Sequence, residues 1–123
     1  MPSGTVLYVD DDRDFADLVD LRLTRELDYD VESVRSADAA FERLAEGDVV
    51  CLVLDYRLPG MSGPEVLEAV TERYPDVPVV FFSGMDAEET AAEMREAGAS
   101  AFVQKDVGSF DALADAVRDA VAE

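Results

Sequence analysis

The sequence contains no histidine and no tryptophan, and it has one cysteine and one lysine among its 123 residues. A single cysteine cannot form an internal disulfide, and Cys51 lies inside an apolar run, which predicts a buried thiol and a reducing, cytoplasmic compartment. No apolar run approaches membrane-spanning length, and residues 1–12 lack the basic start and long apolar stretch of a signal peptide. We therefore expect neither a disulfide scaffold nor a membrane protein.

Basic residues are also scarce, with 10 against 29 acidic residues and a formal net charge of −19 at pH 7. This charge argues against nucleic acid or an anionic membrane as a direct partner. The acids are spread along a chain that is 49% hydrophobic, which indicates a folded domain with an acidic surface. Because nine of the ten basic residues are arginines, the surface resembles that of halophilic proteins, in which molar salt screens the repulsion.

Short apolar runs alternate with amphipathic stretches along the whole chain. We expect strands at residues 5–9, 29–34, 49–54, 77–82 and 99–104, and helices at residues 13–27, 37–45, 64–74, 86–97 and from 109 onward. This alternation predicts one α/β domain over residues 1–123, a flavodoxin-like, doubly wound, five-stranded parallel sheet with helices on both faces. The second strand alone alternates polar and apolar residues, which places it at an edge and favours the strand order 2-1-3-4-5.

The candidate site is centred on Asp55, which follows the apolar run 49–54 and precedes a turn rich in proline and glycine. In an open parallel sheet, ligands bind at the carboxyl ends of the strands, in the crevice between the first and third strands. Polar residues follow the strands near this crevice: Asp10, Asp11 and Asp12 after the first, Asp55 after the third, Ser83 after the fourth and Lys105 after the fifth. Asp12 is expected to be a helix cap or a surface acid and not a metal ligand.

These residue types predict phosphoryl transfer. Clustered carboxylates repel one another unless a cation holds them, and Mg²⁺ suits a site with oxygen ligands, waters and a phosphoryl group. Asp55 would be the nucleophile, with Asp10 and Asp11 holding Mg²⁺. Lys105 would lie opposite the metal, and the hydroxyl of Ser83 would bind the last phosphoryl oxygen. The expected product is an acyl phosphate on Asp55.

Four motifs, VDDD at 9–12, LDYRLPGMSG at 54–63, FFSG at 81–84 and AFVQKD at 101–106, resemble the receiver domain of two-component response regulators of the chemotaxis type. The resemblance covers essentially the whole chain. It implies phosphorylation of Asp55 by a sensor histidine kinase, with Mg²⁺ bound by Asp10, Asp11, Asp55 and the backbone carbonyl of Arg57. It further implies that Ser83 and Phe102 act as switch residues that change a protein-interaction face formed by the fourth helix, fifth strand and fifth helix.

One position departs from the family pattern. Receivers usually have a proline after the lysine, joined by a cis bond, whereas Asp106 follows Lys105 here. A cis bond before a residue other than proline costs about 2.5–4 kcal/mol. We therefore expect slower phosphorylation or a shorter-lived phosphorylated form.

Two alternative functions fit these residues less well. A Mg²⁺-dependent phosphohydrolase with an aspartyl nucleophile would need a second acid at position 57, which is Arg57, and room for a cap domain. A degenerate binding module would lack some of the acceptor, metal and lysine positions, all of which are filled here. The expected chemistry is therefore limited to the domain's own phosphorylation and dephosphorylation. The sequence identifies neither the kinase nor the downstream partner, and a stand-alone regulator, a phosphate sink and a fragment of a hybrid kinase stay open.

Overall fold

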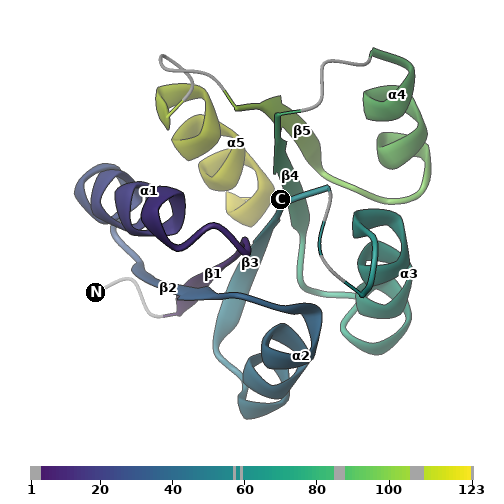
Figure 1. Cartoon of the computed structure of the whole chain (residues 1–123), viewed down its shortest axis with the longest axis horizontal. Coiled ribbons are helices and arrows are strands. Elements are labelled where there is room, and N and C mark those ends of the chain that lie inside the picture. Colours follow the sequence, from purple (N-terminus) through teal and green to yellow (C-terminus); the bar gives the residue numbers. More distant parts are fainter. Residues whose placement is uncertain (1–3, 57, 59, 85–87, 106–109, 123) are drawn as a thin grey trace.

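A parallel sheet lies between two layers of helices (Figure 1). The computed structural model describes residues 4–56, 58, 60–84, 88–105 and 110–122. The strands are β1 (Thr5–Val9), β2 (Asp30–Val34), β3 (Val49–Leu54), β4 (Val79–Ser83) and β5 (Ala101–Gln104), in the order β2-β1-β3-β4-β5. The helices are α1 (Arg13–Glu26), α2 (Ala37–Glu46), α3 (Gly63–Arg73), α4 (Glu88–Glu96) and α5 (Phe110–Ala122). The predicted fold class and strand order are confirmed.

The predicted cap of the first helix is also confirmed, and three strands begin later than predicted: β2 by one residue, and β4 and β5 by two residues each. Asp12 is the N-cap of α1, because its side chain accepts a hydrogen bond from the Phe15 amide at 3.1 Å. β4 begins at Val79 because Pro78 has no amide hydrogen for the ladder. β5 begins at Ala101, since the Ala99 amide donates to the carbonyl of Met94 and so belongs to the turn that follows α4.

The sheet separates two hydrophobic cores. Side chains alternate between the two faces along β1. Val6 and Tyr8 lie in the core beneath α1 and α5, whereas Leu7 and Val9 lie in the core beneath α2, α3 and α4. Cys51 packs in the first of these cores, and burial raises the pKa of its thiol to about 12. The prediction that Cys51 is a buried apolar side chain is therefore confirmed. Among the described helices, none is both long and apolar enough to span a membrane.

The aromatic residues follow the same division. On the α1 and α5 side, ring contacts at 6.0–6.4 Å between centroids form the first aromatic cluster, which consists of Tyr8, Phe15, Phe82 and Phe110. On the opposite side, contacts at 5.8–6.3 Å form the second aromatic cluster, which consists of Tyr56, Phe81 and Phe102. Both clusters reach the carboxyl edge of the sheet, where the candidate site lies.

Gly63 closes the turn that follows β3. Its amide donates a hydrogen bond to the carbonyl of Tyr56 at 2.8 Å. A Cβ atom at this position would lie 2.7 Å from the same Tyr56 oxygen and 2.8 Å from a ring carbon of Phe81. Both distances are shorter than van der Waals contact, so the turn is compatible with glycine alone in its present geometry.

Gly63→Ala is expected to lower the free energy of unfolding by about 1–3 kcal/mol, because the added methyl group must displace backbone or a packed ring. Urea denaturation of the two proteins measures the difference. The matched control is Gly84→Ala, because a Cβ at Gly84 meets no atom within 4 Å. Equal decreases in the free energy of unfolding of the two variants would contradict the idea that the close contacts at Gly63 exclude a side chain there.

Candidate functional site

Three backbone hydrogen bonds fix the candidate residues to the carboxyl edge of the sheet. They run from the Asp10 amide to the Val34 carbonyl (3.1 Å), from the Asp55 amide to the Val9 carbonyl (3.1 Å) and from the Lys105 amide to the Ser83 carbonyl (2.7 Å). Each bond extends the ladder one residue past the end of its strand. The side chains therefore start from backbone positions that the sheet itself determines.

The carboxylates of Asp10, Asp11 and Asp55 come together, as the sequence predicts. Each offers an oxygen, and these oxygens lie within 4.8 Å of one another. Asp10 is 1% exposed, the side chain of Asp55 is 13% exposed, and Asp11 is open to solvent. Three oxygen donors that are closed on one side and open to water on the other fit Mg²⁺, which retains several waters when it binds to proteins.

Lys105 joins two of these carboxylates. Its Nζ donates to Oδ2 of Asp10 at 2.7 Å and to Oδ2 of Asp55 at 3.1 Å, and it lies 4.8 Å from the centroid of the Phe15 ring. Burial alone would lower the pKa of Lys105, but the hydrogen bond to Asp10 and the charges of both carboxylates outweigh it and raise the pKa. The ammonium group is therefore charged at neutral pH.

Asp10 accepts three hydrogen bonds. Oδ2 accepts from Lys105 and from the hydroxyl of Tyr8 at 2.5 Å, and Oδ1 accepts from the Asp12 amide at 3.0 Å. Burial by itself would raise the pKa of Asp10, but the hydrogen bonds from Lys105, Tyr8 and Asp12 together lower it. Asp10 is thus a buried carboxylate that stays ionised at neutral pH.

Sequence reasoning missed Tyr8. It occurs in the run TVLYV, where a tyrosine is expected to be one more buried side chain of a strand. The available signal was the period of two, which places Tyr8 and Asp10 on the same side of the chain. Burial strongly raises the pKa of the Tyr8 hydroxyl, and the hydrogen bond to Asp10 raises it further, so the group acts as a neutral donor.

The two predicted switch residues lie on neighbouring strands. Ser83 ends β4 and is 2% exposed, and it pairs in register with Gln104 of β5. Phe102 is half-buried in β5, with its ring 5.8 Å from that of Phe81 and 6.3 Å from that of Tyr56. Phe102 therefore packs against the residue that directly follows Asp55.

Two sequence predictions concern residues that the structure does not describe. The backbone carbonyl of Arg57 and the bond between Lys105 and Asp106 both involve positions outside the described residues. The fourth metal ligand and the geometry of that bond therefore stay predictions.

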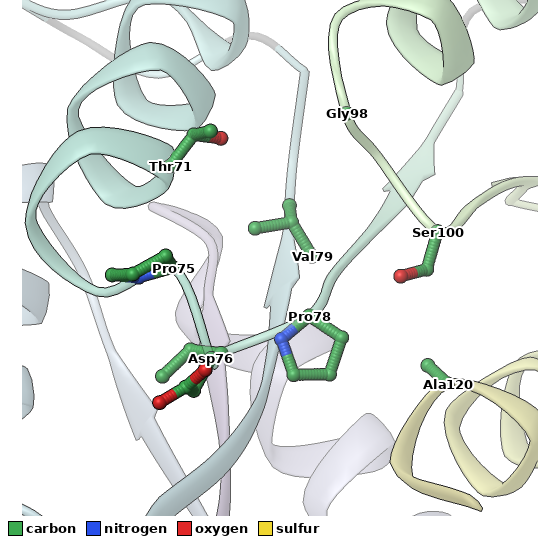
Figure 2. Close-up of a pocket in the computed structure, with 9 residues that line it drawn as sticks. Thr71, Pro75, Asp76, Pro78, Val79, Gly98, Ser100 and Ala120 are labelled. Atoms are coloured by element: carbon green, nitrogen blue, oxygen red, sulfur yellow. The ribbon is translucent and has the colours of Figure 1, made fainter. Parts of the chain in front are cut away.

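A separate cavity of about 220 Å³ lies near the amino end of β4, at the opposite edge of the sheet (Figure 2). Figure 2 shows Thr71 on α3 and Ser100 before β5 on either side of it, with Pro78 between them. Asp76 is the only titratable side chain among the described residues that line this cavity. Its lining lacks the convergent charged groups found around Asp55, so the candidate site is the one at the carboxyl edge.

Comparison with known proteins agrees with the resemblance that the sequence motifs indicate. The family model of the response regulator receiver domain matches residues 6–118. The hydrogenase transcriptional regulatory protein HoxA of Cupriavidus necator is 38% identical over 119 residues, which cover 96% of this chain and 24% of HoxA. The response regulator protein PilR of Pseudomonas aeruginosa is 33% identical over 107 residues, which cover 87% of this chain and 24% of PilR. The chain thus spans about a quarter of the length of these two proteins.

A solved structure with a similar fold is the response regulator TrrA of Thermotoga maritima, which was solved in complex with Mg²⁺ and BeF. It aligns with a TM-score of 0.83 at 22% identity, over 95% of this chain and 98% of that chain. At this identity the similarity shows a common fold.

Proposed function

Because the chain belongs to the response regulator receiver domain family, in which phosphorylation by a histidine kinase is the general function, we propose that Asp55 is the residue that accepts the phosphoryl group. The observation that carries this proposal is the position of Asp55 at the end of β3, where it shares Lys105 with the buried Asp10. Residues 1–123 would act as one receiver domain.

In the proposed reaction, a carboxylate oxygen of Asp55 forms a bond to the phosphorus of a phosphohistidine on the kinase. The bond between phosphorus and the imidazole nitrogen breaks, and its electron pair goes to that nitrogen. The imidazole, which already carries a proton on its other ring nitrogen, leaves in its neutral form. The donor histidine must belong to another protein or another segment, since this chain has none. The domain would catalyse its own phosphorylation and dephosphorylation and no other reaction.

Asp10, Asp11 and Asp55 would hold Mg²⁺, together with the carbonyl of Arg57, which the resemblance implies. The ion would neutralise charge on the phosphoryl oxygens. Support for this cofactor comes from the three clustered carboxylate oxygens and from the Mg²⁺ in the structure of TrrA. Lys105 would bind a phosphoryl oxygen from the opposite side.

Ser83 and Phe102 would act as the switch. The hydroxyl of Ser83 would bond to the phosphoryl group, and Phe102 would move inward behind it. The resulting change of the α4, β5 and α5 face would alter the affinity for a downstream protein. We expect this partner to be a protein and not nucleic acid or membrane, in accord with the net charge of −19. We expect the setting to be cytoplasmic, in accord with the single cysteine.

The proposal is tested by intact mass spectrometry after incubation with acetyl phosphate. The wild-type protein is expected to gain the mass of one phosphoryl group in Mg²⁺ and none in EDTA. A gain that does not depend on Mg²⁺ would contradict the assigned role of the acidic cluster. Absence of any gain in folded protein, with a histidine kinase donor as well as with acetyl phosphate, would contradict the proposal as a whole.

The halophilic interpretation of the acidic surface leads to a second expected result. The free energy of unfolding should rise from low to molar KCl, because salt screens repulsion among the 29 acidic residues. Chemical denaturation with urea, which adds no charge, measures this at each salt concentration. A free energy of unfolding that is already high at low salt and does not change with KCl would contradict it.

A further inference from the structure

We propose that Tyr8 is a positioning residue, whose hydroxyl holds Asp10 in its metal-binding orientation while Lys105 exchanges partners during phosphorylation. This inference rests on the proposed function of Asp55 and of the acidic cluster. It concerns a residue outside the four motifs that identify the family, because VDDD begins at Val9.

The first step is the anchoring of Tyr8 itself. The residue is fully buried, and it pairs in register with Ser33 of β2 and Val53 of β3, so both sides of its backbone are fixed. Its ring packs 6.4 Å from that of Phe82 in the first aromatic cluster. The hydroxyl thus extends from a rigid core to Oδ2 of Asp10.

The second step is the use of the Asp10 oxygens. A carboxylate has about four acceptor positions. Oδ2 accepts from Tyr8 and Lys105, whereas Oδ1 accepts from the Asp12 amide. The remaining acceptor position is therefore on Oδ1. Because the hydroxyl of Tyr8 occupies Oδ2, Oδ1 is the oxygen that stays available to a cation.

The third step compares the two donors to Oδ2. Lys105 also bonds to Asp55, and its side chain is 18% exposed. A phosphoryl group on Asp55 would bring further negative charge to this partner and attract the ammonium group. Tyr8 is neutral and fixed by packing, so the added charge on Asp55 does not draw its hydroxyl away from Asp10. Tyr8 would then keep the carboxylate in place in both states of the domain.

The test is Tyr8→Phe, which removes the hydroxyl and keeps the ring in the core. Hydrogen bonds that orient a metal ligand typically contribute about 10–100-fold to metal affinity. We therefore expect Tyr8→Phe to bind Mg²⁺ about 10-fold more weakly than wild type in isothermal titration calorimetry without a phosphodonor. Tyr29→Phe is the matched control, because Tyr29 packs against the same core but lies just before β2, far along that strand from Ser33, the residue that pairs with Tyr8.

The outcomes separate the inference from the proposed function. Weaker Mg²⁺ binding in Tyr8→Phe, with Tyr29→Phe like wild type, supports the positioning role. Thermal unfolding in EDTA shows whether both proteins are folded. If they are, and if Tyr8→Phe and wild type bind Mg²⁺ with equal affinity, the inference is overturned. Tyr8 would then be a structural residue, and the proposed function would stay intact. Failure of the wild-type protein to bind Mg²⁺ overturns the proposed function and the inference with it.

Discussion

Asp55→Asn is expected to abolish the gain of a phosphoryl group while leaving the protein folded. An amide oxygen is a poor nucleophile, and the other two acids of the cluster cannot replace Asp55, because they follow β1 and not β3. The measurement is intact mass after incubation with acetyl phosphate and Mg²⁺. Asp38→Asn is the control, since it removes an exposed carboxylate from the first turn of α2, outside the acidic cluster. It should be phosphorylated like wild type.

The stability of Asp55→Asn gives a second readout. Three carboxylates within 4.8 Å repel one another, and Lys105 alone cannot balance them. Removing one of these charges should therefore leave the free energy of unfolding in EDTA equal to or higher than that of wild type. A full phosphoryl gain in a folded Asp55→Asn protein would show that another residue is the acceptor.

Lys105→Met is expected to slow phosphorylation by about 100-fold or more, because it removes a positive side chain that bonds to both Asp10 and Asp55. Methionine is close to lysine in length and loses only the contacts of the ammonium group, with the two carboxylates and with the Phe15 ring. The initial rate of phosphorylation at saturating acetyl phosphate and Mg²⁺ measures the effect. Arg118→Met is the control, because Arg118 is an exposed cation that pairs with Glu26 and Asp115.

The loss of Lys105 should also appear as a dependence of stability on metal. Without its ammonium group, Asp10 stays buried beside two other carboxylates and keeps Tyr8 and the Asp12 amide as its donors. The free energy of unfolding of Lys105→Met should fall in EDTA and recover in Mg²⁺, since an ion that binds the folded state stabilises it. A phosphorylation rate within a few-fold of wild type would contradict the proposed role of Lys105.

The sequence was sufficient to predict the sheet and the meeting of Asp10, Asp55 and Lys105. Parallel strands bring their carboxyl ends to one edge, and the polar alternation at Asp30 and Glu32 identified the edge strand β2. Neither inference needs side-chain geometry. Each depends on periodicity and on the position of a residue relative to the end of a strand.

The part that could not be predicted depends on the atomic detail of individual hydrogen bonds. The start of β5 is set by the hydrogen bond from Ala99 to Met94, which a strand pattern alone does not reveal. The role of Tyr8 depends on the direction of one hydroxyl group, and a tyrosine in an apolar run is equally consistent with packing alone. The sequence predicts that Lys105 and Asp10 meet, but it does not predict that Nζ of Lys105 is shared between Asp10 and Asp55.

The division of the aromatic residues by the sheet bears on how such a domain can diverge. Tyr8, in the first aromatic cluster, holds Asp10, whereas Phe102, in the second, lies on β5 beside the proposed output face. The two clusters pack in separate cores. A lineage could therefore change the solvent-accessible residues of β5 near Phe102 to recognise a new partner without changing the hydrogen bond from Tyr8 to Asp10, so one part of the acidic cluster could stay constant while the output face diverges.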